Sequence, residues 1–133
     1  MRAADTSLVV AAFALRNHAH DEARRTLDDG VRLVEHCALE TYSVLTRLPA
    51  PHRGAPAIVQ ESLRARFPQT FLRLPERAYR DFVLGLADAG IAGAAYDALV
   101  AMTAASHDAE LVTCDKRAVP VYERCGVRLQ LLG

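Results

Sequence analysis

Four carboxylates that lie far apart in the chain share a setting that could support chemistry. Asp5 opens the apolar stretch "TSLVVAAFALR", and Asp115 closes the apolar run "ELVTC". Asp97 falls in the first turn of a helix predicted at 96–107, and Glu40 stands in the largely apolar stretch "CALETYSVL". Carboxylates in such places hold hard divalent cations or act as general acids and bases.

Gathered at one place, these four carboxylates would repel one another. Two of them about 5 Å apart, at an effective dielectric constant of about 20, repel by about 3 kcal/mol. Such a cluster stays ionised only if a cation neutralises it. Oxygen ligands without His or Cys favour Mg²⁺ or Mn²⁺ over Zn²⁺.

Each acid also has an ordinary structural explanation. Asp5 and Asp115 are suited to cap helices, Asp97 is a common kind of first-turn acid, and Glu40 could be a partly exposed helical residue. The case for a site therefore depends on whether the fold brings all four to one place.

The hydrophobic pattern predicts strands that alternate with helices. Strands are expected just before Asp5 and at 31–36, 70–74, 109–114 and 127–132. Helices are expected at 6–16, 20–29, 37–48, 56–67, 76–89, 96–107 and 117–125. This order requires crossover connections, so the prediction is a three-layer α/β/α sandwich around a mostly parallel sheet of about five strands.

Ligands bind outside the carboxyl ends of the strands in sheets of this class. Asp5 and Asp115 directly follow strands, so both belong to that edge. Asp97 lies in the first turn of the helix that leads into the strand ending at Asp115. The helix and this strand run antiparallel to each other, so the start of the helix lies near the end of the strand. Glu40 lies in the first turn of the helix after the second strand. The sequence therefore predicts one acidic site at this edge.

Length and composition are typical of one domain over residues 1–133, with 51% hydrophobic residues. No apolar run approaches the roughly 18–20 residues that cross a bilayer, and the start lacks a signal-peptide pattern, so a cytoplasmic protein is expected. Three widely spaced cysteines without C-x-x-C indicate neither a disulfide framework nor a zinc site. The net charge is zero, so nucleic-acid binding would need a local basic patch.

The stretches "DTS" (5–7), "LETYSVL" (39–45) and "YDALVAMTAASHDAELVTCD" (96–115) resemble a PIN domain, specifically the VapC-type toxins of bacterial toxin–antitoxin pairs. The resemblance runs from about residue 3 to the end of the chain. Its most specific part is 96–115, where an aspartate begins a small-residue helix and "A-x-LVT-x-D" follows.

The resemblance implies a Mg²⁺- or Mn²⁺-dependent endoribonuclease whose metal-binding and catalytic acids match Asp5, Glu40, Asp97 and Asp115. It also implies a homodimer that is neutralised by a VapB-type antitoxin, whose C-terminal segment lies across the active-site groove. Within the implied chemistry, Glu40 is expected to bind the metal through water or to orient the attacking water.

The same resemblance implies that three hydroxyls, those of Thr6, Ser7 and Thr113, help to order the acids. Two features depart from the family pattern. The segment "MRAA" before Asp5 is less apolar than usual, which predicts a short first strand. Residues 116–118 are "KRA" where many relatives carry a further acid, so metal binding rests on at most four carboxylates.

Substrate contacts are expected from basic residues near the acids. These are Lys116 and Arg117 after Asp115, and Arg47 and Arg53, with His52 between them, after the Glu40 helix. No histidine is obviously placed to protonate a leaving group. The eight Phe and Tyr side chains are expected mostly in the core, which favours recognition of RNA shape over an aromatic platform.

Two alternatives remain open from the residues alone. A Mg²⁺-dependent phosphoacceptor or phosphatase domain also gathers aspartates at strand ends, but it needs a buried lysine partner, and the only lysine is Lys116. A non-catalytic PIN-like binding module is the other, and it would not need all four acids to bind metal.

Overall fold

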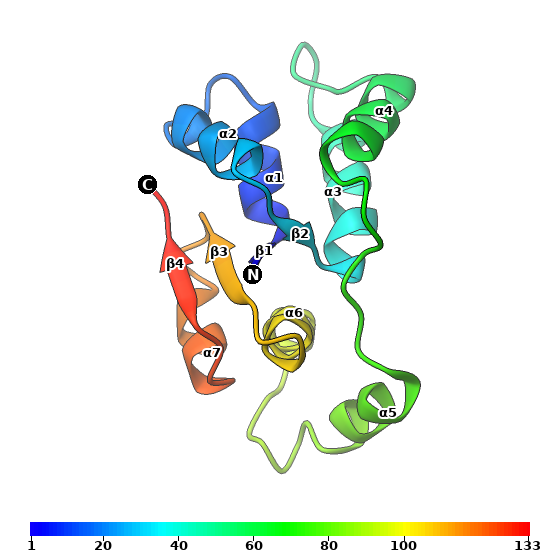
Figure 1. The fold of residues 1–133 in the computed structure, drawn as a ribbon, viewed down its shortest axis with the longest axis vertical. Helices are drawn as coiled ribbons and strands as arrows, with labels where there is room; N and C mark the ends of the chain where they lie inside the picture. The colour runs from blue at the N-terminus through cyan, green and yellow to red at the C-terminus, as the bar shows by residue number, and fades with distance from the viewer.

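The fold is a parallel sheet of four strands flanked by seven helices, seen in a computed structural model that describes residues 1–133 (Figure 1). The strands are β1 (Arg2–Ala4), β2 (Arg32–Leu33), β3 (Glu110–Thr113) and β4 (Leu129–Leu131). The helices are α1 (Thr6–Phe13), α2 (His20–Asp28), α3 (Glu35–Arg47), α4 (Pro56–Arg66), α5 (Glu76–Leu84), α6 (Ala95–Ser106) and α7 (Val119–Arg124). This confirms the predicted α/β sandwich.

The strand order is β2-β1-β3-β4, and every pairing is parallel. The two central strands are buried: Ala3 and Ala4 of β1 and Leu111 and Val112 of β3 have no exposed surface. Strands covered on both faces by helices are mostly apolar, and here the buried middle of each strand is apolar, whereas Arg2 and Glu110 at the strand starts are partly exposed. The short first strand predicted from "MRAA" is therefore present, because two alanines fit the crowded centre of the sheet.

The prediction of a fifth strand at 70–74 was wrong, because the sheet has four strands. Leu72 makes only an isolated bridge to Val34: its N–H donates to the Leu33 carbonyl at 2.9 Å, and its carbonyl accepts from the N–H of Glu35 at 2.8 Å. Beyond that point β2 offers no further partner, because the chain turns into α3 at Glu35. The predicted strand at 31–36 is shortened for the same reason.

The helices differ from the predictions mainly at their ends. α1 stops at Phe13 rather than at residue 16, and α5 stops at Leu84, where Gly85 forms the C-cap. Figure 1 shows α3 and α4 side by side next to β2, whereas α5 lies apart from the sheet at the end of the molecule and has no buried residue. None of the helices combines the length and the apolar character needed to cross a bilayer.

Candidate active site

A small cleft of about 50 Å³ lies at the carboxyl edge of the sheet, and all four predicted acids line it. Asp5 follows β1, Asp115 comes two residues after the end of β3, Asp97 stands in the first turn of α6, and Glu40 projects from α3. The structure thus brings together acids that are separated by as many as 110 positions in the sequence.

Asp5 is both the N-cap of α1 and a wall of the cleft, with only 3% of its surface exposed. Its Oδ1 accepts hydrogen bonds from Ser7 Oγ at 2.6 Å and from the N–H of Leu8 at 3.1 Å. Its Oδ2 accepts from the hydroxyl of Tyr122 at 2.9 Å. Burial raises the pKa of the Asp5 carboxyl above its usual range, and these hydrogen bonds act in the opposite direction by stabilising the charged form.

A chain of hydroxyl contacts joins the end of β1 to the end of β3. Ser7 Oγ, besides donating to Asp5, accepts from the N–H of Cys114 at 2.8 Å and lies 3.1 Å from Thr113 Oγ1. Thr113 Oγ1 in turn accepts from the N–H of Asp115 at 3.0 Å. The Ser7 hydroxyl has a single proton, and it donates that proton to Asp5. In its contact with Thr113 it can therefore only accept, so the Thr113 hydroxyl is the donor. The backbone on both sides of the cleft is fixed by this chain.

Glu40 is held from two sides. The Thr6 hydroxyl donates a short hydrogen bond to Glu40 Oε1, which ties α3 to the first residue of α1. The other oxygen, Oε2, lies 3.7 Å from Nε2 of His36, one turn earlier on α3. His36 Nε2 is buried and has no hydrogen-bond partner. His36 therefore lies beside Glu40, although the sequence indicated no histidine obviously placed to protonate a leaving group.

Asp97 is the one of the four acids whose carboxylate has no bonding partner in the protein. Its half-buried carboxylate makes no side-chain hydrogen bond and no ion pair. Desolvation is the largest cause that raises its pKa, and the negative charges of Asp115, Glu40 and Asp5 raise it further, against a lowering by Arg117. The other three acids therefore act electrostatically on Asp97, as expected where carboxylates gather to bind a cation.

The predicted basic residues divide into two groups. Lys116 and Arg117 are exposed and directly follow Asp115, which lines the cleft: the N–H of Arg117 donates to Asp115 Oδ1 at 3.0 Å, and the Arg117 side chain is 95% exposed. Arg47 and Arg53 are not in the cleft. Arg47 is seven residues beyond Glu40 on α3, about 10 Å along the helix axis, and Arg53 donates to the Leu48 carbonyl at that far end.

Three rings and one thiol in the cleft were not identified from the sequence: those of His36, Tyr96, Tyr122 and Cys37. Of these four residues, only His36 could have been identified from the sequence, because it lies four residues before Glu40 and so shares its helix face. Burial raises the pKa of the Cys37 thiol to about 12, so the thiol stays neutral and adds no charge to the cleft.

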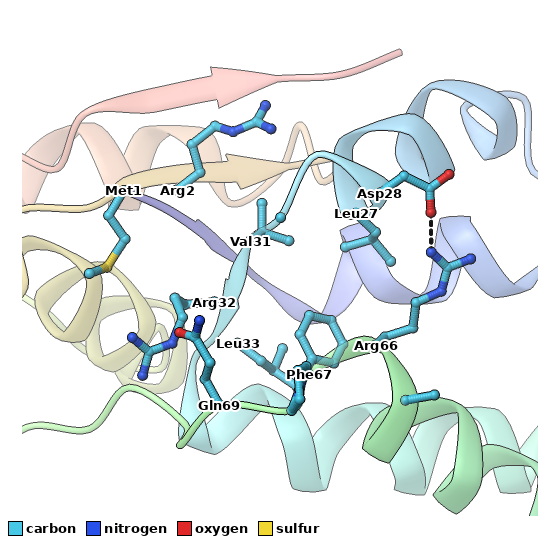
Figure 2. Close-up of a pocket in the computed structure, with 13 residues that line it drawn as sticks. Met1, Arg2, Leu27, Asp28, Val31, Arg32, Leu33, Arg66, Phe67 and Gln69 are labelled. Carbon is cyan, nitrogen blue, oxygen red and sulfur yellow. Dashed lines mark hydrogen bonds and ion pairs between the residues drawn. The ribbon is translucent and has the colours of Figure 1, made fainter.

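A larger hollow of about 520 Å³ lies at the opposite, amino-terminal edge of the sheet (Figure 2). Figure 2 shows Val31, Leu33 and Phe67 around its middle, while Arg66 is paired with Asp28 at its rim. The guanidinium groups in the hollow point away from one another. Because its charged groups do not converge, this hollow has no catalytic arrangement, and the small acidic cleft remains the candidate site.

The residues of the acidic cleft fit a divalent cation by the chemistry of their donor set. All four acids supply oxygen ligands, and Asp97 keeps both oxygens free. No three His, Cys, Asp or Glu side chains are close enough together to share a metal ion in this arrangement. Binding of one cation by three of these acids therefore requires their side chains to move closer together.

Residues 3–123 match the PIN domain family. Over 133 residues, 99% of both chains, the sequence is 47% identical to Ribonuclease VapC40 in two strains of Mycobacterium tuberculosis. It is also 47% identical over 98 residues to Ribonuclease VapC27 of Mycobacterium tuberculosis, which covers 73% of this chain and 71% of that protein.

Proposed function

The chain belongs to the PIN domain family, with VapC-type ribonucleases as its relatives, and we propose that it is a Mg²⁺- or Mn²⁺-dependent endoribonuclease. The reaction is hydrolysis of RNA phosphodiester bonds. The observation that carries the proposal is the convergence of four acids from four elements on one cleft, in a chain similar along its whole length to a protein named a ribonuclease.

Asp5, Asp97 and Asp115 are the residues that would hold the cation. When bound, the cation lowers the pKa of a water molecule and neutralises charge that develops on the phosphate oxygens. The chain's own contribution is orientation: Ser7 and Tyr122 fix the Asp5 carboxylate by hydrogen bonds.

Glu40 is the acid best placed to act on water. Thr6 fixes one of its oxygens, and the other faces His36 in the cleft. In our proposal Glu40 either receives a proton from the attacking water or binds the cation through water. Lys116 and Arg117, exposed beside Asp115, would contact flanking phosphates, since the neutral net charge offers no general attraction for RNA.

The phosphoacceptor alternative loses support, because it needs a buried lysine and Lys116 is exposed. A non-catalytic PIN-like module is separated from a nuclease by experiment. Purified protein should cleave RNA with Mg²⁺ or Mn²⁺, stop when EDTA is added, and resume when the cation is restored in excess. RNA ends mapped by sequencing give both the rate and the cleavage site.

Glu40→Gln should reduce the cleavage rate by about 10²- to 10⁴-fold, the usual contribution of a general base. The matched control is Glu61→Gln, since Glu61 is exposed and pairs only with Arg64 on α4. Circular dichroism should show both variants folded. Cleavage that persists in EDTA, or equal rates for the two variants, would contradict the proposed chemistry.

We further propose that the protein is the toxin of a type II toxin–antitoxin pair, inhibits translation and growth, and is neutralised by a VapB-type antitoxin. The resemblance of its motifs to VapC-type toxins supports this, as does the likeness to VapC40. Expression of the chain alone should arrest growth, and co-expression of a short neighbouring reading frame should relieve the arrest. Growth that continues while RNA is being cleaved would contradict the toxin role.

A homodimer is the oligomeric state that we propose. The motif resemblance supports it, and α5 offers apolar surface for an interface, because Tyr79, Val83 and Leu84 are all exposed there. Exposed apolar surface of this kind is common at protein–protein interfaces. Light scattering of the purified protein measures the mass directly, and a mass of 14.5 kDa at micromolar concentration would contradict the dimer.

A further inference from the structure

Tyr96 is an aromatic side chain exposed at the mouth of the acidic cleft. It stands at the start of α6, directly before Asp97, and 69% of its surface is accessible to solvent. The other exposed aromatic residues, Phe71 and Tyr79, are not in this cleft, and Tyr122 in the cleft is buried. The expectation that aromatic residues are mostly in the core was wrong, since only Phe67 and Tyr122 are buried.

The orientation of the Tyr96 ring is set by a second ring. His36 of α3 stacks on Tyr96 with ring centroids 4.9 Å apart and an angle of 8° between the planes. This contact joins α3, which carries Glu40, to α6, which carries Asp97. His36 can cover only one face of Tyr96, and with 69% of the side chain accessible the opposite face is open to solvent.

The charges around this pair of rings favour one kind of ligand. Glu40, Asp97 and Asp115 line the same cleft, so an anionic group at the rings would be repelled. A nucleobase is planar and uncharged, and its stacking on an aromatic side chain does not depend on its hydrogen-bonding edge. A base that is already paired in a helix is not available for such stacking, so the ligand must be single-stranded.

We propose that Tyr96, supported by His36, stacks on a nucleobase of single-stranded RNA next to the bond that is cleaved. This rests on the proposed ribonuclease function and adds to it a binding site for one base. The base enlarges the stack from two rings to three. Because every base has an aromatic face, the contact selects an unpaired nucleotide beside the cleaved bond rather than a particular sequence.

Removing the ring should weaken substrate binding more than it slows the chemical step. Tyr96→Ala should raise KM by about tenfold to a hundredfold, the range measured for loss of one stacked base, and should change kcat by less than about threefold. Tyr96→Phe keeps the aromatic face and should behave like the wild type. Phe71→Ala removes an exposed aromatic ring outside the cleft and is the matched control.

A fluorescent base reports the stacking separately from cleavage. RNA oligonucleotides carry 2-aminopurine at successive positions around the cleavage site and are mixed rapidly with protein and Mg²⁺. At one position the emission should fall on binding to wild type, Tyr96→Phe and Phe71→Ala, and should not fall with Tyr96→Ala. An abasic nucleotide at that position should raise KM for the wild type but not for Tyr96→Ala.

The outcomes separate the two proposals. Quenching that depends on Tyr96, in a protein that does not cleave RNA, would support the stacking site and contradict the nuclease function alone. Cleavage with the same KM and the same quenching in wild type and Tyr96→Ala would overturn the stacking site and leave the nuclease function standing.

Discussion

Asp97→Asn should abolish RNA cleavage and, in the absence of divalent cations, make the protein more stable than the wild type. The cleavage rate should fall at least about 10³-fold, equivalent to about 4 kcal/mol of activation free energy, because the cation loses its one unhindered ligand. The free energy of unfolding should rise by about 1 kcal/mol, the scale of charge interactions that are partly solvated. A catalytic carboxylate that destabilises the fold is the physical mark of a cation site.

The gain in stability follows from the raised pKa of Asp97. Burial and the neighbouring acids raise it above the usual 3.8, so the unfolded chain loses this proton at a lower pH than the folded protein does. As the pH rises from about 3.8 through the folded pKa, the unfolded state binds fewer protons and the stability of the wild type falls. The side-chain amide in Asp97→Asn cannot ionise. The difference in free energy of unfolding between the variant and the wild type should therefore be absent at pH values well below the usual carboxyl pKa. It should reach its full size at pH values above the pKa of Asp97 in the folded protein.

Thermal unfolding in EDTA at several pH values measures this difference, and addition of Mg²⁺ gives an internal check. If the proposed function is correct, Mg²⁺ binds the folded state, so it should stabilise the wild type and reduce the difference in stability from Asp97→Asn. Asp88→Asn is the matched control, because Asp88 is exposed, makes no ion pair and lies outside the cleft. If Asp97→Asn is less stable than the wild type in EDTA at neutral pH, the carboxylate is a structural group and the assignment fails.

The convergence of the acids was predictable because it depends on topology alone. Asp5 and Asp115 each follow a strand of one parallel sheet, and carboxyl ends of parallel strands meet at one edge. That reasoning needs only the order of elements, and errors of two or three residues at their ends do not affect it. The missing fifth strand at 70–74 also left it intact, because that segment would have joined β2 at the edge of the sheet.

The residues around the acids were harder to predict, because their roles depend on element boundaries and on tertiary contacts. His36 was placed in a strand, which hid its i, i+4 relation to Glu40; α3 in fact begins at Glu35. Tyr122 reaches Asp5 across 117 positions, and no local pattern distinguishes it from an ordinary core tyrosine. Exposure of Tyr96 follows from its place at the N-terminal end of α6, which propensity does not specify.

The hydroxyl of Ser7 is the second position where a small change should have a large effect. Ser7→Ala removes the donor to Asp5, the acceptor for the N–H of Cys114 and the partner of Thr113 in one step. The free energy of unfolding should fall by about 1–3 kcal/mol, the usual result of leaving a buried polar group unsatisfied. Alanine favours a helix slightly more than serine does, but that gain is a few tenths of a kcal/mol and does not offset the loss.

Cleavage should fall by about 10- to 100-fold in Ser7→Ala, the usual effect of removing a group that orients a metal ligand. Ser62→Ala is the matched control, because Ser62 is half-buried on α4 and its hydroxyl makes no hydrogen bond. Chemical denaturation measures the loss of stability, and initial rates measure the loss of cleavage. Both losses should occur in Ser7→Ala, and neither should occur in Ser62→Ala.

A double-mutant cycle then distinguishes one connected network from independent contacts. Thr113→Val removes the hydroxyl that lies 3.1 Å from Ser7 Oγ and accepts the N–H of Asp115. If Ser7 and Thr113 hold the two strand ends together as a unit, the double variant should lose less stability than the sum of the single variants, by at least about 0.5 kcal/mol. Additive losses would mean that each hydroxyl serves only its own strand, and the idea of a shared support for Asp5 and Asp115 would have to be given up.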